Sequence, residues 1–229
     1  MSEAGGQTAD GGRSSDIGGR KSEIGNRNAE RDREDLEFMR RVQADDEGAL
    51  GALMERWELP VKTLIARIVL NARDAEELAQ ETFGRVWQQR KKFRADAPFR
   101  PWVFAIAINL ARNRLRWWRK RPEISLQEWS EPGVEDSGAR SQGSAFGAPL
   151  SEPGSETATA ALERVERATA VREAIAALPR ELREAVVLFE YEELSHAEIA
   201  ATLGCTAKAV ESRLYRARAQ LRASLKRWL

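Results

Sequence analysis

The chain has few of the residues on which most catalytic and metal sites depend. Its 229 residues include one cysteine, Cys205, and one histidine, His196. A single cysteine can form neither an internal disulfide nor a cysteine cluster for zinc, and it favours a reducing cytoplasmic setting. With one histidine, most acid/base and metal-dependent chemistry is also disfavoured. We therefore expect no cofactor, no metal and no catalytic residues, and a protein that is not an enzyme.

Long apolar runs and strand patterns are also lacking. No stretch approaches the ~20 apolar residues that a membrane helix needs, and the first residues lack the charged-then-apolar pattern of a signal peptide. We expect no membrane insertion and a cytoplasmic location. Alternating β-branched runs bounded by hairpin turns do not occur, so the sequence predicts an all-α fold.

Composition divides the chain into four parts. Residues 1–32 are rich in glycine, serine and polar residues and predict a disordered tail. Residues 122–159 are rich in proline, glycine and serine, with seven acids against the single base Arg140, and predict a flexible acidic linker. The remaining residues, 33–121 and 160–229, are expected to form two small helical domains.

The third helix of the first domain is predicted to begin with a capping motif. Asp74 has the type and position of a helix cap, and Glu77 follows three residues later, where it could reach back to the cap. Phe83 and Val86 would supply the buried side of this acidic helix.

Basic charge is concentrated in one segment near the end of the first domain. The formal charge of the whole chain is only +1, yet Asp96 is the only acid between Arg90 and Arg121. The core of this segment reads FRADAPFRPWVFAIAINLARNRLRWWRKR from Phe93 onward. Phosphate attraction supplies most sequence-independent affinity for nucleic acid, and aromatic rings stack on unpaired bases.

The same segment predicts an amphipathic helix with Pro101 in its first turn. Its apolar face is broad, and one polar stripe recurs at i, i+3, i+4 and i+7, formed by Asn109, Arg112, Asn113 and Arg116. Asparagine can read base edges through paired hydrogen bonds. The stripe suits an unpaired nucleic-acid strand, and an ordinary amphipathic surface helix is the alternative.

The second domain contains the pattern of a helix-turn-helix. In LSHAEIAATLGCTAKAVESRLYRARAQLR, Ser195 and Glu198 form a capping box, Gly204 is suited to end the helix, and Thr206 can cap the next. The second helix buries an apolar stripe and exposes a largely basic face, as in DNA-reading helices. A helical hairpin used for protein contacts is the alternative.

Taken together, these motifs resemble the sigma-70 family of bacterial sigma factors, in particular its compact extracytoplasmic-function group. The resemblance covers about Glu34 to Arg121 and Ala160 to Leu229. The segment DAEELAQETFGRVWQQRKKF resembles the polymerase-binding helix, the basic segment resembles the promoter-melting region, and the helix-turn-helix resembles the reader of the minus-35 element. A sigma-2 and a sigma-4 domain are implied, bound to core RNA polymerase, with an anti-sigma factor as a candidate further partner.

The resemblance also assigns functional residues by position. Residues expected to meet core polymerase are Asp74, Glu77, Gln80, Glu81 and Trp87. The resemblance and the polar stripe together indicate the residues that contact the single-stranded minus-10 element, which are Arg94, Trp102, Asn109, Arg112, Asn113 and Arg116. Residues expected to contact the duplex minus-35 element are Lys208, Glu211, Ser212, Arg213, Tyr215 and Arg216.

Two positions depart from the family pattern. Family members often carry a small or basic residue where Glu211 stands and glycine where Lys208 stands, so a promoter sequence cannot be transferred. A stand-alone helix-turn-helix regulator is the alternative function. Such a regulator does not need an acidic helix followed by a helix whose asparagines contact single-stranded DNA. The first domain therefore discriminates between a sigma factor and a stand-alone regulator.

Overall fold

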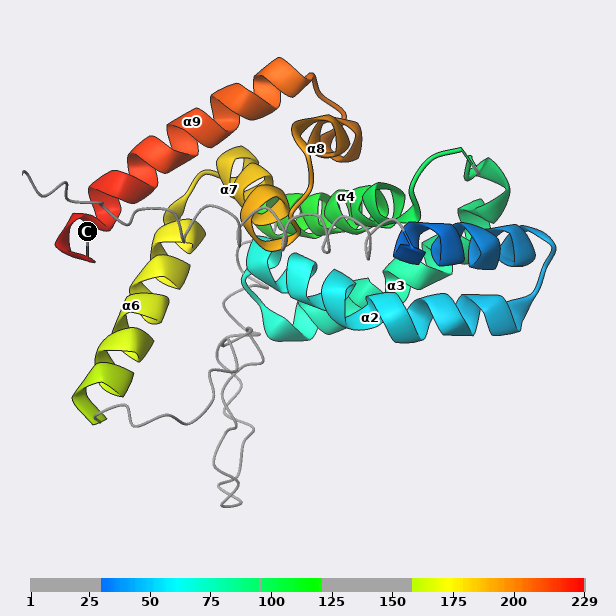
Figure 1. Cartoon of the computed structure of the whole chain (residues 1–229), viewed down its shortest axis with the longest axis horizontal. Coiled ribbons are helices and arrows are strands. Elements are labelled where there is room, and N and C mark those ends of the chain that lie inside the picture. The colour runs from blue at the N-terminus through cyan, green and yellow to red at the C-terminus, as the bar shows by residue number, and fades with distance from the viewer. Residues whose placement is uncertain (1–29, 95, 121–157, 229) are drawn as a thin grey trace, which may run out of the picture.

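The computed structural model describes residues 30–94, 96–120 and 158–228, and within these ranges the chain is all-α with no strand (Figure 1). Residues 1–29 of the predicted tail (1–32) and residues 122–157 of the predicted acidic linker (122–159) lie outside the described residues. The remaining residues of both segments, 30–32 and 158–159, are helical, so each predicted segment extends two or three residues too far. The first helix covers residues 30–43. The elements that follow are α2 (Glu47–Val69), α3 (Ala72–Gln89), the 3-10 turn η1 (Arg90–Lys92), α4 (Phe99–Lys120), α6 (Ala158–Ala177), α7 (Arg180–Val186), the π-helical η2 (Val187–Tyr191), α8 (His196–Leu203), α9 (Ala207–Ser224) and η3 (Lys226–Trp228).

Residues 30–120 form a bundle, here called the N-terminal bundle, in which α2, α3 and α4 contact one another. Its centre is aromatic. The ring of Trp57 meets Phe104 edge-on at 5.7 Å and Phe99 at 6.0 Å between ring centroids. Both phenylalanines are fully buried, and burying each is worth about 1.5–3 kcal/mol. This core holds α4 in place and leaves one side of it exposed.

The start of α3 differs from the prediction, which placed its cap at Asp74. The cap is Asn71, whose Oδ1 accepts a hydrogen bond of 3.1 Å from the backbone N–H of Asp74. Asparagine and aspartate are both good caps, and Asn71 to Asp74 repeats the spacing of Asp74 to Glu77. With the cap at Asn71, Asp74 is a buried acid in the first turn of α3, where its carboxylate pairs with Arg114 at 2.8 Å.

Residues 158–228 form the C-terminal bundle, and its predicted helix-turn-helix signals are confirmed. The Ser195 hydroxyl accepts from the N–H of Glu198, and the Glu198 carboxylate accepts at 2.8 Å from the N–H of Ser195. Gly204 ends α8 with φ of 66°, a conformation that glycine adopts without strain. Thr206 caps α9 by accepting from the N–H of Ala209 at 3.2 Å. Helix α9 therefore leaves the turn at a defined angle.

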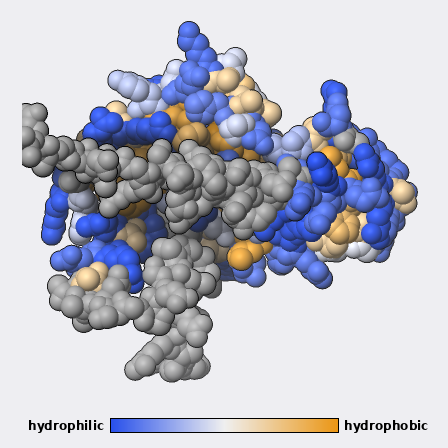
Figure 2. Space-filling model, in the orientation of Figure 1, coloured by the Kyte–Doolittle hydropathy of each residue, from blue (hydrophilic) through white to orange (hydrophobic). Residues whose placement is uncertain are grey.

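The two bundles pack against each other, which the sequence did not predict. Helix α4 contacts α8, and α2 contacts η2 (Figure 1). The Arg183 guanidinium donates to the carbonyl of Ile68 at 2.9 Å, and the Thr202 hydroxyl lies 3.4 Å from the carbonyl of Pro101. Arg67 reaches the ring of Tyr191, with its guanidinium carbon 4.0 Å from the ring centroid. Among the residues that are coloured in Figure 2, hydrophilic ones predominate, with apolar patches between them.

Candidate nucleic-acid interface

The predicted polar stripe of α4 is largely exposed. Asn109, Asn113 and Arg116 lie outside the core, whereas Val103, Phe104 and Ala107 on the other side are buried. At about 100° per residue, the three exposed side chains project from one side of the helix. Two amides and a guanidinium on one solvent-facing surface are suited to bases and phosphates of a single strand.

Two further residues assigned to the minus-10 strand stand near the start of α4. Trp102 is half-buried and packs on the ring of Phe93 at 5.0 Å and that of Phe99 at 6.0 Å. Its indole is therefore held in a fixed position by two rings. Arg94 is exposed and pairs with Asp96 at 2.7 Å, and that contact raises the pKa of Arg94 and lowers the pKa of Asp96.

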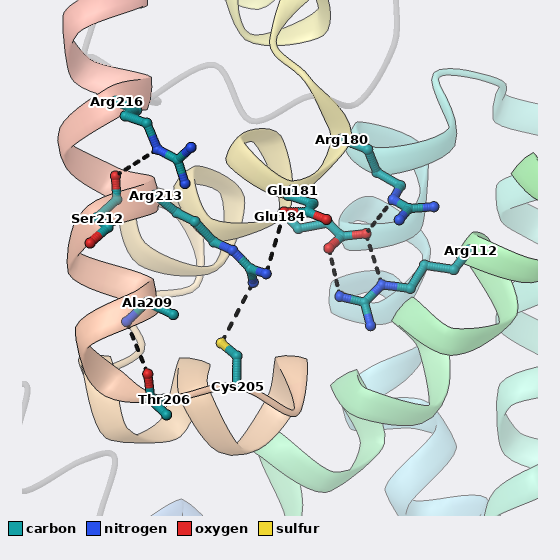
Figure 3. A network of polar contacts seen from close by, with 10 residues as sticks. All are labelled: Arg112, Arg180, Glu181, Glu184, Cys205, Thr206, Ala209, Ser212, Arg213 and Arg216. Carbon is teal, nitrogen blue, oxygen red and sulfur yellow. Dashed lines mark hydrogen bonds and ion pairs between the residues drawn. The ribbon is translucent and has the colours of Figure 1, made fainter.

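Arg112, the remaining residue of the stripe, does not face solvent as the other three do. Its guanidinium donates two hydrogen bonds, of 3.0 and 2.7 Å, to the carboxylate of Glu184 on α7 (Figure 3). Glu184 is fully buried, and Arg180 approaches the same carboxylate at 3.5 Å. The hydrogen bonds to Glu184 raise the pKa of Arg112, so the guanidinium stays charged. Arg112 thus faces the C-terminal bundle, while its stripe neighbours face solvent.

Only some of the residues of the acidic helix α3 that were assigned to core polymerase are exposed to solvent. Arg114 of α4 binds the buried Asp74 and the exposed Glu77, each at 2.8 Å. These ion pairs fasten α3 to α4. Gln80 and Glu81 are exposed, Glu81 with a contact of 3.1 Å to Arg85.

Trp87, the last residue assigned to polymerase, is half-buried at the end of α3. The guanidinium of Arg90 lies over its ring, 4.1 Å from the centroid. Of the five assigned residues, Glu77, Gln80 and Glu81 are thus the exposed ones, and Glu77 is already paired with Arg114 within the bundle.

The exposed face of α9 carries most of the residues assigned to the minus-35 element. Tyr215 is 77% exposed and stands free of the core. The others on this face are Lys208, Glu211, Ser212 and Arg216. Arg213 instead points inward, with a guanidinium nitrogen 3.5 Å from Cys205 Sγ and another 3.5 Å from Glu181 (Figure 3). It therefore braces α9 against α7 and the turn.

One neighbour of the α9 face was missed by sequence reasoning. His196, the first residue of α8, places Nδ1 3.9 Å from a carboxylate oxygen of Glu211 and tilts against the ring of Phe189 at 5.4 Å. His196 and Glu211 line a shallow hollow together with Tyr215 and Arg218. No sequence signal marks this contact, because it depends on the angle between α8 and α9.

The described residues carry no grouping of three His, Cys, Asp or Glu side chains suited to a metal ion. Along the described helices, no stretch is long and apolar enough to cross a bilayer.

Two family models match the two bundles in order. The model of sigma-70 region 2 matches residues 53–121, and the model of sigma-70 region 4 matches residues 168–221. The chain belongs to the sigma-70 family. It is therefore a sigma factor, a non-enzymatic initiation factor that binds core RNA polymerase and directs it to promoter DNA. The region 2 match sets aside the stand-alone regulator.

Curated relatives place the sigma factor in the extracytoplasmic-function group. It is 32% identical over 185 residues to the RNA polymerase sigma-H factor of Pseudomonas aeruginosa, covering 81% of this chain and 90% of that protein. It is also 32% identical over 185 residues to the ECF RNA polymerase sigma-E factor of Escherichia coli K12, covering 80% of this chain and 90% of the relative.

Solved structures show the same fold. The structure of CnrH in complex with the cytosolic domain of CnrY matches with a TM-score of 0.57 at 25% identity, covering 84% of this chain and 97% of that one. The sigma factor RpoE of Bartonella quintana, in complex with the anti-sigma factor NepR, matches with a TM-score of 0.52 at 20% identity, covering 77% of this chain and 96% of that one.

Proposed function

We propose that the two bundles divide promoter recognition between them. The N-terminal bundle, within residues 33–121, holds the unpaired minus-10 strand on α4. The C-terminal bundle, within residues 160–229, reads the duplex minus-35 element with α9. The observation that carries this assignment is the exposed row of Asn109, Asn113 and Arg116 on a helix whose other side is fully buried.

Physical chemistry explains why such a row favours melted DNA. The Watson–Crick edge of a base becomes available for reading only when the base leaves the stack. Asn109 and Asn113 are one turn apart and face solvent, so each can offer an amide to an extruded base. Arg116 adds a cation for the phosphate backbone, and Trp102 supplies an indole beside the helix start. The helix therefore stabilises the open form of the minus-10 element.

The experiment that tests the proposal is transcription in vitro with purified core RNA polymerase across a library of genomic promoter fragments. We expect transcripts that depend on adding the chain and that share one minus-35 and one minus-10 motif. Transcripts without a shared minus-10 motif would contradict the assignment of α4. Because core RNA polymerase works in the cytoplasm, we propose that location for the chain as well.

An anti-sigma factor is proposed as a further partner. The CnrH structure contains the cytosolic domain of CnrY, and the Bartonella quintana structure contains an anti-sigma factor. Only the first of these matches reaches 25% identity, and it supports an equivalent partner for this chain.

For core polymerase, we predict that Glu81→Lys weakens binding on the order of fivefold. Glu81 is exposed on the acidic face of α3, and its loss leaves the Asp74–Arg114 ion pair intact. Competition with another sigma factor for core enzyme measures the effect. Breaking the contact to Arg85 costs about 0.3–0.5 kcal/mol, so circular dichroism stays nearly unchanged.

The matched control is Glu166→Lys, which makes the same charge change at an exposed position of α6. If Glu81→Lys competes as well as Glu166→Lys, the acidic face of α3 is ordinary surface and polymerase is contacted elsewhere.

For the minus-35 element, we predict that Glu211 sets a preference for a base that offers an amino group. A carboxylate in the major groove accepts from cytosine N4, whereas guanine presents only acceptors there. Glu211→Arg should reverse the preference toward guanine by about 1–3 kcal/mol at the base pair that position 211 faces. Selection from randomised minus-35 duplexes by the holoenzyme measures it.

Glu163→Arg, on the exposed side of α6, serves as the control for added charge. The assignment of Glu211 is wrong if both variants select the same minus-35 motif as the original chain.

A further inference from the structure

Arg112 and Glu184 join the two bundles through a close ion pair of 2.7 Å, and a longer ion pair, Arg67 with Glu192 at 3.5 Å, lies elsewhere on the same boundary. The carboxylate of Glu184 is fully buried and receives two hydrogen bonds from one guanidinium, at 3.0 and 2.7 Å. The other hydrogen bonds across this boundary, from Arg183 to Ile68 and from Thr202 to Pro101, end on neutral backbone carbonyls. Figure 3 shows Glu184 between Arg112 of α4 and Arg180 of its own helix.

The place of Arg112 on α4 gives this contact a functional meaning. Arg112 directly precedes Asn113 and lies one turn from Asn109 and Arg116, so its side chain borders the exposed stripe. A guanidinium binds a carboxylate and a phosphate through the same pair of parallel hydrogen bonds. In this structure, here called the closed form because the two bundles are packed together, the carboxylate of Glu184 uses the two guanidinium donors of Arg112 that a phosphate could accept from.

We propose that Arg112 is a phosphate site for the unpaired promoter strand, and that Glu184 fills this site in the free chain. The proposal rests on the strand-binding role proposed for α4 and adds a competition to it. The C-terminal bundle must leave α4 before the strand can use all the cations beside Asn109 and Asn113. The free chain is therefore held in a form with reduced affinity for single strands.

The exchange leaves neither Arg112 nor Glu184 without a partner of opposite charge. When the bundles separate, Glu184 keeps Arg180, which lies 3.5 Å away on the same helix, and becomes accessible to water. Arg112 exchanges one anionic partner for another, a carboxylate for a phosphate. The raised pKa of Arg112 keeps it cationic in the closed form, so no proton is taken up or released at this residue. A partner that holds the bundles apart, as core polymerase would, favours the open form because it binds that form better.

The test compares binding of a short labelled single strand of mixed sequence to the free full-length chain and to Glu184→Gln. Removing the carboxylate charge should raise strand affinity about tenfold, as expected for one charge-assisted contact. It should also steepen the dependence of log K on log salt by about 0.7, the value for one added phosphate contact on a single strand. A purely structural role for Glu184 would not change this slope.

Two further variants separate the contributions. Glu190→Gln removes a carboxylate of the same bundle that pairs with the exposed Arg218 at 3.4 Å, and its strand affinity should equal that of the original chain. In Glu184→Gln combined with Arg112→Gln, the added salt slope should disappear. If Glu184→Gln gains no more affinity or slope than Glu190→Gln, the proposal is overturned.

Arg112→Gln alone provides a second route if Glu184→Gln folds poorly. It breaks the same ion pair from the N-terminal bundle, so small-angle scattering should show a larger radius of gyration without any gain in salt slope. An unchanged radius of gyration would contradict the proposal that this ion pair holds the two bundles together.

Transcription by the original chain with core polymerase is a separate experiment. If no transcripts form, the proposed function is contradicted, while the binding of single strands to the free chain and to Glu184→Gln still tests the competition at Arg112.

Discussion

Replacing Asn109 and Asn113 together by alanine is expected to reduce open-complex formation by about a hundredfold or more. Each bidentate contact between an amide and a base edge is worth about 1–3 kcal/mol, and the two exposed side chains lie on one face of α4. Because the contacts form only with melted DNA, binding to core polymerase should not change. Potassium permanganate footprinting of the minus-10 region measures the effect.

The control is Glu55→Ala, which removes an exposed polar side chain from α2, a helix to which no contact with DNA or polymerase is assigned. It should open promoters as the original chain does. If the double variant melts DNA normally and keeps its base preference, the polar face of α4 is not the strand-binding surface.

Phe104→Ala is expected to lower the free energy of unfolding of the N-terminal bundle by about 3–5 kcal/mol. Phe104 is fully buried and meets Trp57 edge-on at 5.7 Å, so truncation leaves a cavity under α4 and removes an aromatic pair. Loss of this support should weaken polymerase binding and promoter melting together. Urea unfolding followed by tryptophan fluorescence measures the change.

Leu59→Ala offers the contrast within the same bundle. Leu59 is 63% exposed on α2, and removing its side chain should change stability by less than about 0.5 kcal/mol. Equal destabilisation by the two variants would show that the core is not centred on Phe104 and Trp57.

Local features of the chain could be predicted because their signals are local. The capping box of Ser195 and Glu198, the ending of α8 at Gly204 and the cap at Thr206 each depend on residues a few positions apart. The solvent-facing row on α4 follows from helical periodicity alone. The start of α3 was predicted late because Asn71 and Asp74 offer the same capping chemistry at the same spacing.

Contacts between distant segments could not be predicted in this way. Arg112 and Arg213 were both grouped with DNA-facing residues, yet one binds Glu184 of the other bundle and the other braces α9 against Glu181. Periodicity places a residue on a face of its helix but does not say which helix that face meets. The packing of the two bundles, and the contact of His196 with Glu211, depend on tertiary geometry.

The most direct measurement of the central claim is the position of the minus-10 strand on the protein in the open complex. A photoreactive base placed in the non-template strand of a promoter, in a complex with core polymerase and the chain, identifies the residues that it touches. We expect crosslinks on α4, in the segment from Trp102 to Arg116 that carries Asn109 and Asn113. Crosslinks confined to the C-terminal bundle, or none to α4, would contradict the account.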